Sequence, residues 1–242
     1  VTNQNAKGEF YLTDIVGLAR ARSLHVGTCH TDEGLALLGV NTPAQLADAE
    51  HICQTRLRQK KLRDGVYLKD PSSTYFNHDT TIGKGTTVGP NVQFLEGVTV
   101  GDTCTLEGNS VFKDTTLEAR AHILSFCHLD GAYVAQGATV GPFARLRKGS
   151  HLGESSKIGN FCEVKNTELG AGSKASHLTY LGDAHIGSDV NIGAGTITCN
   201  YDGSKKHKTT IENGAFIGSN TSLVAPVKIG EGALIAAGAT IR

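Results

Sequence analysis

The stretch TTIGKGTTVGPNVQFLEGVTVG, residues 80–101, carries an apolar residue at every sixth position, and glycine follows three of the four. The same register, with occasional five-residue steps, holds to the end of the chain apart from one long interruption. A period of six matches neither an α-helix, with 3.6 residues per turn, nor simple strand alternation, with a period of 2.0. It predicts a solenoid in which each hexad forms one short parallel strand and one bend, with the apolar side chain pointing inward. Glycine follows 12 of the 25 positions, which are Ile82, Val88, Phe94, Val100, Leu106, Phe112, Leu117, Ile123, Leu129, Val134, Val140, Leu146, Leu152, Ile158, Val164, Leu169, Ala175, Leu181, Ile186, Ile192, Ile217, Leu223, Ile229, Ile235 and Ile241.

The composition agrees with a repetitive, tightly turned chain rather than an ordinary compact globule. Of 242 residues, 30 are Gly and 6% are aromatic, and 23 basic residues balance 23 acidic ones. Zero net charge argues against nucleic acid or an anionic membrane surface as the main partner. No apolar run approaches the roughly 18 residues that a membrane span needs, so we expect no membrane insertion. The six Cys stand far apart without a C-x-x-C pair, which favours reduced, buried thiols and a cytoplasmic location.

The hexad pattern resembles the hexapeptide-repeat family. This resemblance implies a mostly β fold, a left-handed parallel β-helix with three flat faces, in which three hexads make one coil. Residues 18 apart should then stack about 4.8 Å from one another on neighbouring coils. The left hand comes from the resemblance alone, because crossover connections are usually right-handed.

One stretch, residues 198–216, breaks the register and is rich in polar residues and glycine. We expect it to leave the coil as an excursion, which is either a tolerated insertion or a functional loop. A loop held by a rigid scaffold carries function disproportionately often.

Upstream of the hexads, residues 42–65 are expected to form one long helix. Thr42 is the expected N-cap, Pro43 the first helical residue and Gln45 the partner that completes a capping box, while Gly65 provides a stop. The basic residues near its end are interpreted as a solvated face that complements the helix dipole, with a nucleic-acid patch as the less favoured alternative. The residues before Thr42 are too few for a core of their own, so we interpret them as the tail of a larger domain.

Two cations, Arg147 and Lys165, each follow an inward residue and lie 18 positions apart. They are expected to stack on one face, where they repel each other unless an anion lies between them. The arrangement suits a phosphate group, because Arg can donate two parallel hydrogen bonds to it and Lys adds a compact positive charge. The alternative is two surface cations that point apart into water.

A histidine lies close to this pair in the sequence. His177 can accept a proton near neutral pH, and Tyr180, Asn191 and the loop at residues 200–203 follow it closely. Together with the cations, these groups suit a phosphorylated polar substrate, although a lone His is more often structural.

Two other interpretations stay open at this point. His122 and His128 are six residues apart, hence on neighbouring faces, which gives weak support to a zinc hydratase of the hexapeptide-repeat type. A third ligand would have to come from another subunit. The other alternative is a non-catalytic solenoid scaffold, which would need neither the stacked cations nor the polar excursion.

Several motifs closely resemble one enzyme family, the bacterial bifunctional N-acetylglucosamine-1-phosphate uridyltransferase / glucosamine-1-phosphate acetyltransferase. The motifs HLTYLGDA (177–184) and NIGAGTITCNYDG (191–203) carry most of the resemblance, and GPFARLR (141–147) and IGNFCEVK (158–165) fit the same family. NAKGEFYLTDI (5–15) resembles the end of its uridyltransferase half. The resemblance implies that residues 1–41 are a C-terminal remnant of an α/β uridyltransferase domain, 42–65 a helical linker and 66–242 the β-helix acetyltransferase domain.

The resemblance implies transfer of an acetyl group from acetyl-CoA to the amine of glucosamine 1-phosphate. The N-acetylglucosamine 1-phosphate so formed serves UDP-GlcNAc, peptidoglycan and lipopolysaccharide synthesis. It also implies a homotrimer with each active site between subunits. His177 is then the general base. The implied substrate-binding residues are Arg147, Lys165, Tyr180, Asn191, Asn200 and Lys206. The implied acetyl-CoA residues are Ala194, Asn200, Tyr201, Ser219 and Ala237.

The uridyltransferase reaction, which joins UTP and N-acetylglucosamine 1-phosphate with Mg²⁺, is not expected of this chain. Asn41 matches the family's magnesium-ligating Asn, but its acidic partner and the Gly-rich nucleotide loop would precede Val1. We therefore expect a fragment without bound Mg²⁺. The chain also stops at Arg242, before a short arm that gives the family further acetyl-CoA contacts, so weakened acetyl-CoA binding is an expectation.

Overall fold

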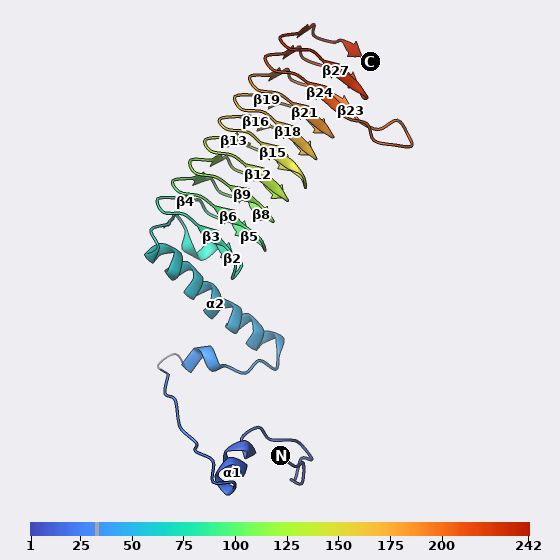
Figure 1. Cartoon of the computed structure of the whole chain (residues 1–242). Helices are drawn as coiled ribbons and strands as arrows, with labels where there is room; N and C mark the ends of the chain where they lie inside the picture. Colours follow the sequence, from blue (N-terminus) through green and yellow to red (C-terminus); the bar gives the residue numbers. More distant parts are fainter. Residues whose placement is uncertain (32–33) are drawn as a thin grey trace. The chain divides into compact units, whose positions relative to one another are not determined.

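The computed structural model describes residues 1–31 and 34–242 and divides into two compact units, Val1–Ala49 and Glu50–Arg242 (Figure 1). The first unit holds α1 (Asp14–Ala21), η1 (Gly34–Leu37) and the start of α2 (Pro43–Arg63). The predicted capping box of α2 is present. The Thr42 hydroxyl accepts a hydrogen bond from the Gln45 amide at 3.2 Å, and the Gln45 side chain accepts one from the Thr42 amide at 3.1 Å. The assignment of residues 1–41 to a uridyltransferase domain stays a prediction.

The second unit is a solenoid of three parallel sheets whose strands alternate along the chain (Figure 1). Sheet A consists of β1 (Tyr67–Leu68), β4 (Thr87–Val88), β7 (Thr105–Leu106), β10 (His122–Ile123), β13 (Thr139–Val140), β16 (Lys157–Asn160), β19 (Lys174–His177), β22 (Asn191–Ile192), β25 (Phe216–Ile217) and β28 (Leu234–Ile235). Sheet B consists of β2 (Tyr75–Phe76), β5 (Gln93–Phe94), β8 (Val111–Lys113), β11 (His128–Asp130), β14 (Arg145–Leu146), β17 (Glu163–Lys165), β20 (Tyr180–Gly182), β23 (Ile197–Cys199), β26 (Ser222–Val224) and β29 (Thr240–Ile241). Sheet C consists of β3 (Thr81–Ile82), β6 (Thr99–Val100), β9 (Thr116–Leu117), β12 (Ala132–Val134), β15 (Ser150–Leu152), β18 (Thr167–Leu169), β21 (Ala184–Ile186), β24 (Thr209–Ile211) and β27 (Val227–Ile229). A short 3₁₀ helix, η2 (Pro71–Ser73), lies between β1 and β2.

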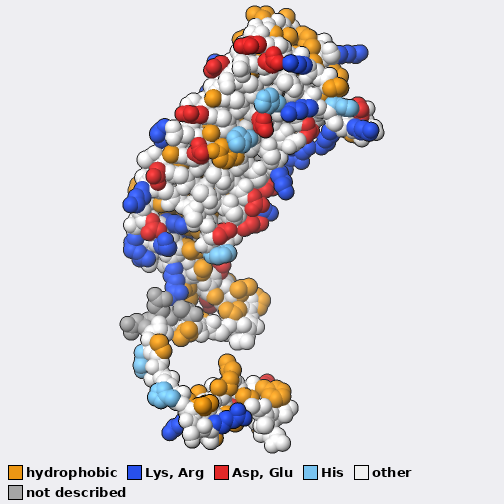
Figure 2. Space-filling view, viewed as in Figure 1, with side chains coloured by type: hydrophobic (Ala, Val, Ile, Leu, Met, Phe, Trp, Pro, Cys, Tyr) orange, Lys and Arg blue, Asp and Glu red, His pale blue; other side chains and the backbone are white. Residues whose placement is uncertain are grey.

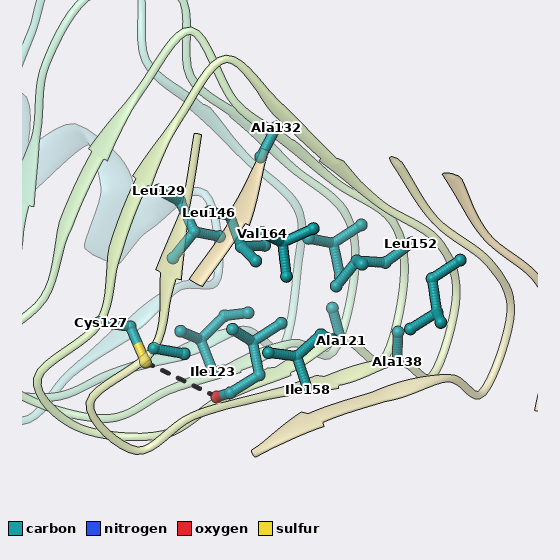
Figure 3. Packing of buried hydrophobic residues seen from close by; sticks show 14 of the residues in the cluster. Ala121, Ile123, Cys127, Leu129, Ala132, Ala138, Leu146, Leu152, Ile158 and Val164 are labelled. Atoms are coloured by element: carbon teal, nitrogen blue, oxygen red, sulfur yellow. Dashed lines mark hydrogen bonds between the residues drawn. The ribbon is translucent and has the colours of Figure 1, made fainter. Parts of the chain in front are cut away.

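The predicted apolar register is the core of the solenoid. In sheet B, Leu129, Leu146 and Val164 are paired one above the other across neighbouring strands, and each is fully buried (Figure 3). Figure 3 shows the same stacking for Ile123 and Ile158 on the facing side of the interior. Each inward side chain therefore contacts its equivalents on the coils before and after it. The predicted left-handed parallel β-helix is confirmed.

The helix α2 covers the first coils through polar contacts as well as apolar ones. The side chain of Gln54, which is buried, donates to the Phe76 carbonyl at 2.7 Å and accepts from the Phe76 amide at 2.9 Å. The buried Lys61 ammonium donates to the Thr80 carbonyl, and burial lowers the pKa of this lysine. The expectation that the basic end of this helix is a solvated face is therefore wrong for Lys61.

The excursion is shorter than predicted, because β23 ends at Cys199 and β24 begins at Thr209. Residues 200–208 form the loop that projects beside β23 (Figure 1). Thr198 occupies an inward position and is buried. Its hydroxyl is satisfied there, because it accepts a hydrogen bond from the Gly182 amide at 2.7 Å and donates one to the Gly182 carbonyl at 3.1 Å. Ile211 resumes the apolar register, paired with Ile229.

The expectation of buried thiols holds for half of the cysteines. Cys104, Cys127 and Cys162 are buried, whereas Cys29 and Cys53 are exposed and Cys199 is half-buried. Burial raises the pKa of Cys127 to about 11, which makes this thiol a poor nucleophile at neutral pH. Within the described residues, no helix is long and apolar enough to cross a membrane.

Candidate active site

The strand β20 connects two edges of sheet B that differ in chemistry. At its start, the bend between sheets A and B carries the histidine edge, which we define as Asn160, His177 and Leu178. At its end, the bend between sheets B and C carries the charged edge, defined as Arg147, Lys165, Asp183 and Lys206. Six steps along the chain separate His177 from Asp183, so their Cα atoms lie at most about 20 Å apart at about 3.3 Å per residue.

The predicted stacking of Arg147 and Lys165 agrees with the strand register, because Leu146 pairs with Val164. Neither cation is left without a carboxylate. Arg147 Nη1 lies 2.9 Å from an oxygen of Glu163, and Lys165 Nζ lies 3.7 Å from an oxygen of Asp183. The repulsion expected between the stacked cations is therefore balanced within the chain.

Asp183 is the centre of the charged edge. Its two carboxylate oxygens accept hydrogen bonds from the side-chain amides of Asn166 at 2.7 Å and Asn200 at 2.6 Å. Partial burial alone would raise the pKa of this carboxyl. The hydrogen bonds from Asn166 and Asn200 and the charges of Lys165 and Lys206 nevertheless hold it below its usual range. Asp183 therefore stays ionised at neutral pH and fixes Asn200 and Lys165, two side chains assigned to substrate binding.

The loop brings a third cation to this edge. Lys206 interacts with Lys165, which is the main reason that the pKa of Lys206 is lowered. The pKa of Lys165 is raised, first by its contact with the Lys206 amine and then by the charge of Asp183. Three cations thus share one small region, where an anionic group would relieve their mutual repulsion.

The loop that carries Lys206 is held by Asp202. One oxygen of this carboxylate accepts from the amides of Ser204 and Lys205 at 2.7 and 2.6 Å, and the other lies 2.6 Å from His207 Nε2. The hydrogen bond from the Lys205 amide, together with those from His207 and Ser204, lowers the pKa of Asp202 well below its usual range. Figure 2 shows basic and His side chains gathered on this loop.

Tyr180 and Asn200 extend the charged edge over the face of sheet B. The Tyr180 hydroxyl lies 3.4 Å from Asn200 Nδ2. Both side chains lie over Gly182, where an added Cβ would come within 2.7 Å of Asn200 Nδ2 and would also clash with the Tyr180 hydroxyl. Only glycine fits beneath this pair.

A cavity of about 260 Å³ opens beside the charged edge. Its lining includes Asn166, Asp183 and Lys206, together with Lys208 from the end of the loop. The cavity does not reach His177, so the hollow in one chain and the candidate base are at different edges of sheet B.

Among the residues that the structure describes, the histidine edge has no charged partner. His177 is exposed, and its Nδ1 lies 2.6 Å from Oδ1 of Asn160 on the preceding coil. The three residues Ala194, Ser219 and Ala237 occupy the same corner on the coils that follow. The amide after each one donates to the carbonyl on the preceding coil, with N···O distances of 3.4 Å to His177, 2.7 Å to Ala194 and 2.8 Å to Ser219. Three of the residues assigned to acetyl-CoA therefore form one column that leads to His177.

Other assigned residues lie elsewhere in the structure. Asn191 begins β22 and belongs to sheet A, away from the charged edge. Tyr201 is exposed on the loop, and its hydroxyl donates to the Gly203 carbonyl at 2.6 Å. Asn41 is exposed in the Val1–Ala49 unit, and the described residues include no cluster of three His, Cys, Asp or Glu side chains suited to a metal ion. The assignment of Asn41 to a magnesium site stays a prediction.

The zinc alternative depends on His122 and His128. His122 and His128 lie in different sheets, as the spacing predicted, and His122 Nε2 pairs with Glu107 at 3.1 Å. Residues 1–31 and 34–242 bring no third ligand to them.

Sequence reasoning missed three residues of this site. Glu163 precedes Lys165 by two positions, so strand alternation could have placed it on the same face. The coil that separates Asn160 from His177 contains one five-residue step, so the spacing of 17 could have predicted their stacking. Asp183 lies 17 positions after Asn166, and both occupy the same corner with positive φ, 51° and 46°, so the same spacing could have predicted their contact.

Comparisons with known proteins agree with this architecture. Residues 79–114 and 208–242 match the family described as Bacterial transferase hexapeptide (six repeats). The chain is 50% identical to the Bifunctional protein GlmU of Paramagnetospirillum magneticum over 100% of this chain and 50% of that protein. It is 43% identical to the Bifunctional protein GlmU of Shouchella clausii over 100% of this chain and 53% of that protein. The chain thus spans about half the length of the curated relatives it matches.

Among solved structures, the UDP-N-acetylglucosamine acyltransferase of Arabidopsis shares the fold. The TM-score is 0.50 at 19% identity, over 69% of this chain and 65% of that one.

Proposed function

The chain belongs to the hexapeptide-repeat transferases and corresponds to the C-terminal half of the bifunctional GlmU proteins, and from this premise we propose that it acetylates glucosamine 1-phosphate with acetyl-CoA. One observation carries the proposal. A single sheet face has a histidine at one edge and three clustered cations at the other. Because the amine and the phosphate of glucosamine 1-phosphate lie on adjacent carbons, the proposal needs the histidine edge of one subunit to lie next to the charged edge of its neighbour.

In the proposed reaction, the amine nitrogen attacks the thioester carbon of acetyl-CoA. The His177 imidazole accepts a proton from that nitrogen as the C–N bond forms. The C–S bond then breaks, and CoA leaves and takes up a proton as the thiol. A positioned general base contributes about 10²–10⁴-fold to such a step.

The charged edge supplies the anion-binding part of the proposal. Arg147, Lys165 and Lys206 hold the phosphate, whose negative charge replaces part of the balance now provided by Glu163 and Asp183. Charge-assisted hydrogen bonds of this kind are roughly twice as strong as neutral ones. Tyr180 and Asn200, fixed over Gly182, then contact the sugar next to its phosphate.

The corner column provides the route for acetyl-CoA in the proposal. Ala194, Ser219 and Ala237 have small side chains, so they leave room for an extended chain along the corner that ends at His177. Asn191 and Tyr201 point to the need for a neighbouring subunit, since they lie away from this column in one chain.

A homotrimer would complete the site, and an apolar stripe supports this part of the proposal. Phe126, Phe143 and Phe161 stack along the same corner, with ring centroids 4.8 and 5.3 Å apart, and each is about half exposed. Leu178 continues the stripe next to His177 and is 62% exposed. Contiguous apolar side chains of this kind favour a protein partner. Phe143→Lys is therefore expected to shift the sedimentation of the protein from trimer to monomer and to abolish transfer.

The experiment that tests the function is release of CoA thiol from acetyl-CoA by the purified chain. We expect release that depends on glucosamine 1-phosphate and forms N-acetylglucosamine 1-phosphate, the precursor of UDP-GlcNAc. A chain that sediments as a trimer but releases no CoA would contradict the proposal and favour the scaffold alternative. Activity that disappears with stoichiometric zinc on chelation would favour the hydratase alternative.

A further inference from the structure

The contact between His177 and Asn160 determines more than the position of the ring. Backbone pairing places Asn160 directly opposite His177, because β16 and β19 are neighbours in sheet A. The distance from His177 Nδ1 to Asn160 Oδ1 is 2.6 Å, and this is the imidazole's one side-chain hydrogen bond within the described residues. The rest of the ring is exposed.

A carbonyl oxygen accepts hydrogen bonds and cannot donate them, so the proton of this contact must be on His177 Nδ1. The other ring nitrogen, Nε2, then carries the lone pair. We propose that Asn160 is a positioning residue that holds His177 in the Nδ1–H tautomer and presents Nε2 as the proton acceptor. This inference rests on the proposed acetyl transfer, in which His177 is the base.

The neutrality of Asn160 matters to this role. Three other histidines, His122, His185 and His207, pair with carboxylates at 3.1, 2.6 and 2.6 Å. A carboxylate stabilises the protonated imidazolium, which cannot accept a further proton. An amide fixes the same tautomer without adding charge, so it orients the ring without favouring the imidazolium.

The first test uses the protein without substitutions in the site. Nitrogen-15 NMR of histidine-labelled protein distinguishes a protonated ring nitrogen from one with a free lone pair, and His177→Gln assigns the signals. Above the titration range of the ring, we expect Nδ1 protonated and Nε2 unprotonated. A proton on Nε2 would overturn the proposal, whatever the variants do.

The second test compares variants by steady-state kinetics. Asn160→Ala is expected to lower kcat by about tenfold to a hundredfold, the range found when the partner that orients a functional histidine is removed. The KM for glucosamine 1-phosphate should stay within about twofold. The matched control is Ser125→Ala, because Ser125 occupies the equivalent corner position two coils earlier and bonds to Glu107 instead.

Asn160→Asp separates positioning from a merely structural role. The carboxylate keeps the tautomer but favours the imidazolium. The pH below which kcat falls should therefore rise by roughly one unit, and kcat should recover at pH values above that point. An Asn160→Ala protein with unchanged kcat and an unchanged NMR tautomer would refute the role of Asn160. If His177→Ala itself keeps full activity, the proposed function fails instead.

Discussion

The two edges of sheet B in the coil of β20 differ in charge, although one three-residue strand joins them. The histidine edge has a neutral amide as the partner of its one titratable group. The charged edge has three cations, two neighbouring carboxylates and an Asn pair fixed by Asp183. Under the proposed function, this difference predicts that the histidine edge moves a proton and the charged edge binds an anion. Substitutions at the first should change kcat, and substitutions at the second should change KM.

The largest effect is expected at the histidine edge. His177→Ala should lower kcat by about 10²–10⁴-fold, because the general base is lost, and leave the KM for glucosamine 1-phosphate almost unchanged. Steady-state CoA release measures both constants. His185→Ala is the matched control, since His185 pairs with Glu168 on sheet C and should retain full turnover. Equal losses of kcat in the two variants would contradict the role of His177 as the general base.

An intermediate effect is expected from the cation stack. Arg147→Ala should raise the KM for glucosamine 1-phosphate by roughly 10- to 100-fold, because it removes a hydrogen bond to a charged group. The measurement is the substrate dependence of CoA release at fixed acetyl-CoA. Arg145→Ala, two residues earlier at the start of β14, should leave KM within about twofold. A KM that is unchanged by Arg147→Ala would contradict the proposal that the charged edge binds the phosphate.

A smaller effect is expected from Asp183. Asp183→Asn keeps the shape of the side chain but removes the charge that holds Lys165. The KM should therefore rise by roughly three- to tenfold, with kcat changed less. Asn166→Ala, which removes one of the two amide partners, should act in the same direction but more weakly.

The same residue predicts a pH dependence of stability. Folding lowers the pKa of Asp183, so its carboxylate stabilises the fold above the unfolded pKa of about 3.9, and this contribution is lost as pH falls through the folded pKa. The Tm difference between wild type and Asp183→Asn should be largest at pH 7 and shrink towards pH 3. A difference that is the same at both pH values would mean that the carboxylate charge does not contribute.

The sequence predicted most of the fold because each hexad contributes one inward residue, and a solenoid repeats this rule on every coil. The prediction failed at Thr198, where a buried hydroxyl satisfied by the Gly182 backbone replaces an aliphatic residue. It also failed for Lys61, because the carbonyl groups at the solenoid's first coils need polar partners from α2.

The candidate site was predictable to a different extent. Spacing alone placed Arg147 and Lys165 on one face, and the resemblance supplied His177. Neither identified Asp183, because the hexad rule was applied to the inward residues and not to the corner residues, which recur with the same period. The position of Lys206 beside Lys165 depends on how Asp202 folds the loop, which no periodicity describes.

The most direct test of the two-edge account is the ratio of kcat/KM for glucosamine 1-phosphate to that for glucosamine. The wild-type chain should prefer the phosphorylated substrate by at least about 10²-fold, since glucosamine has no phosphate to bind the three cations of the charged edge. Arg147→Ala should lose most of this preference, whereas His177→Ala should slow both substrates equally and keep it. Equal use of the two substrates by the wild-type chain, or a preference that is lost in His177→Ala, would contradict the account.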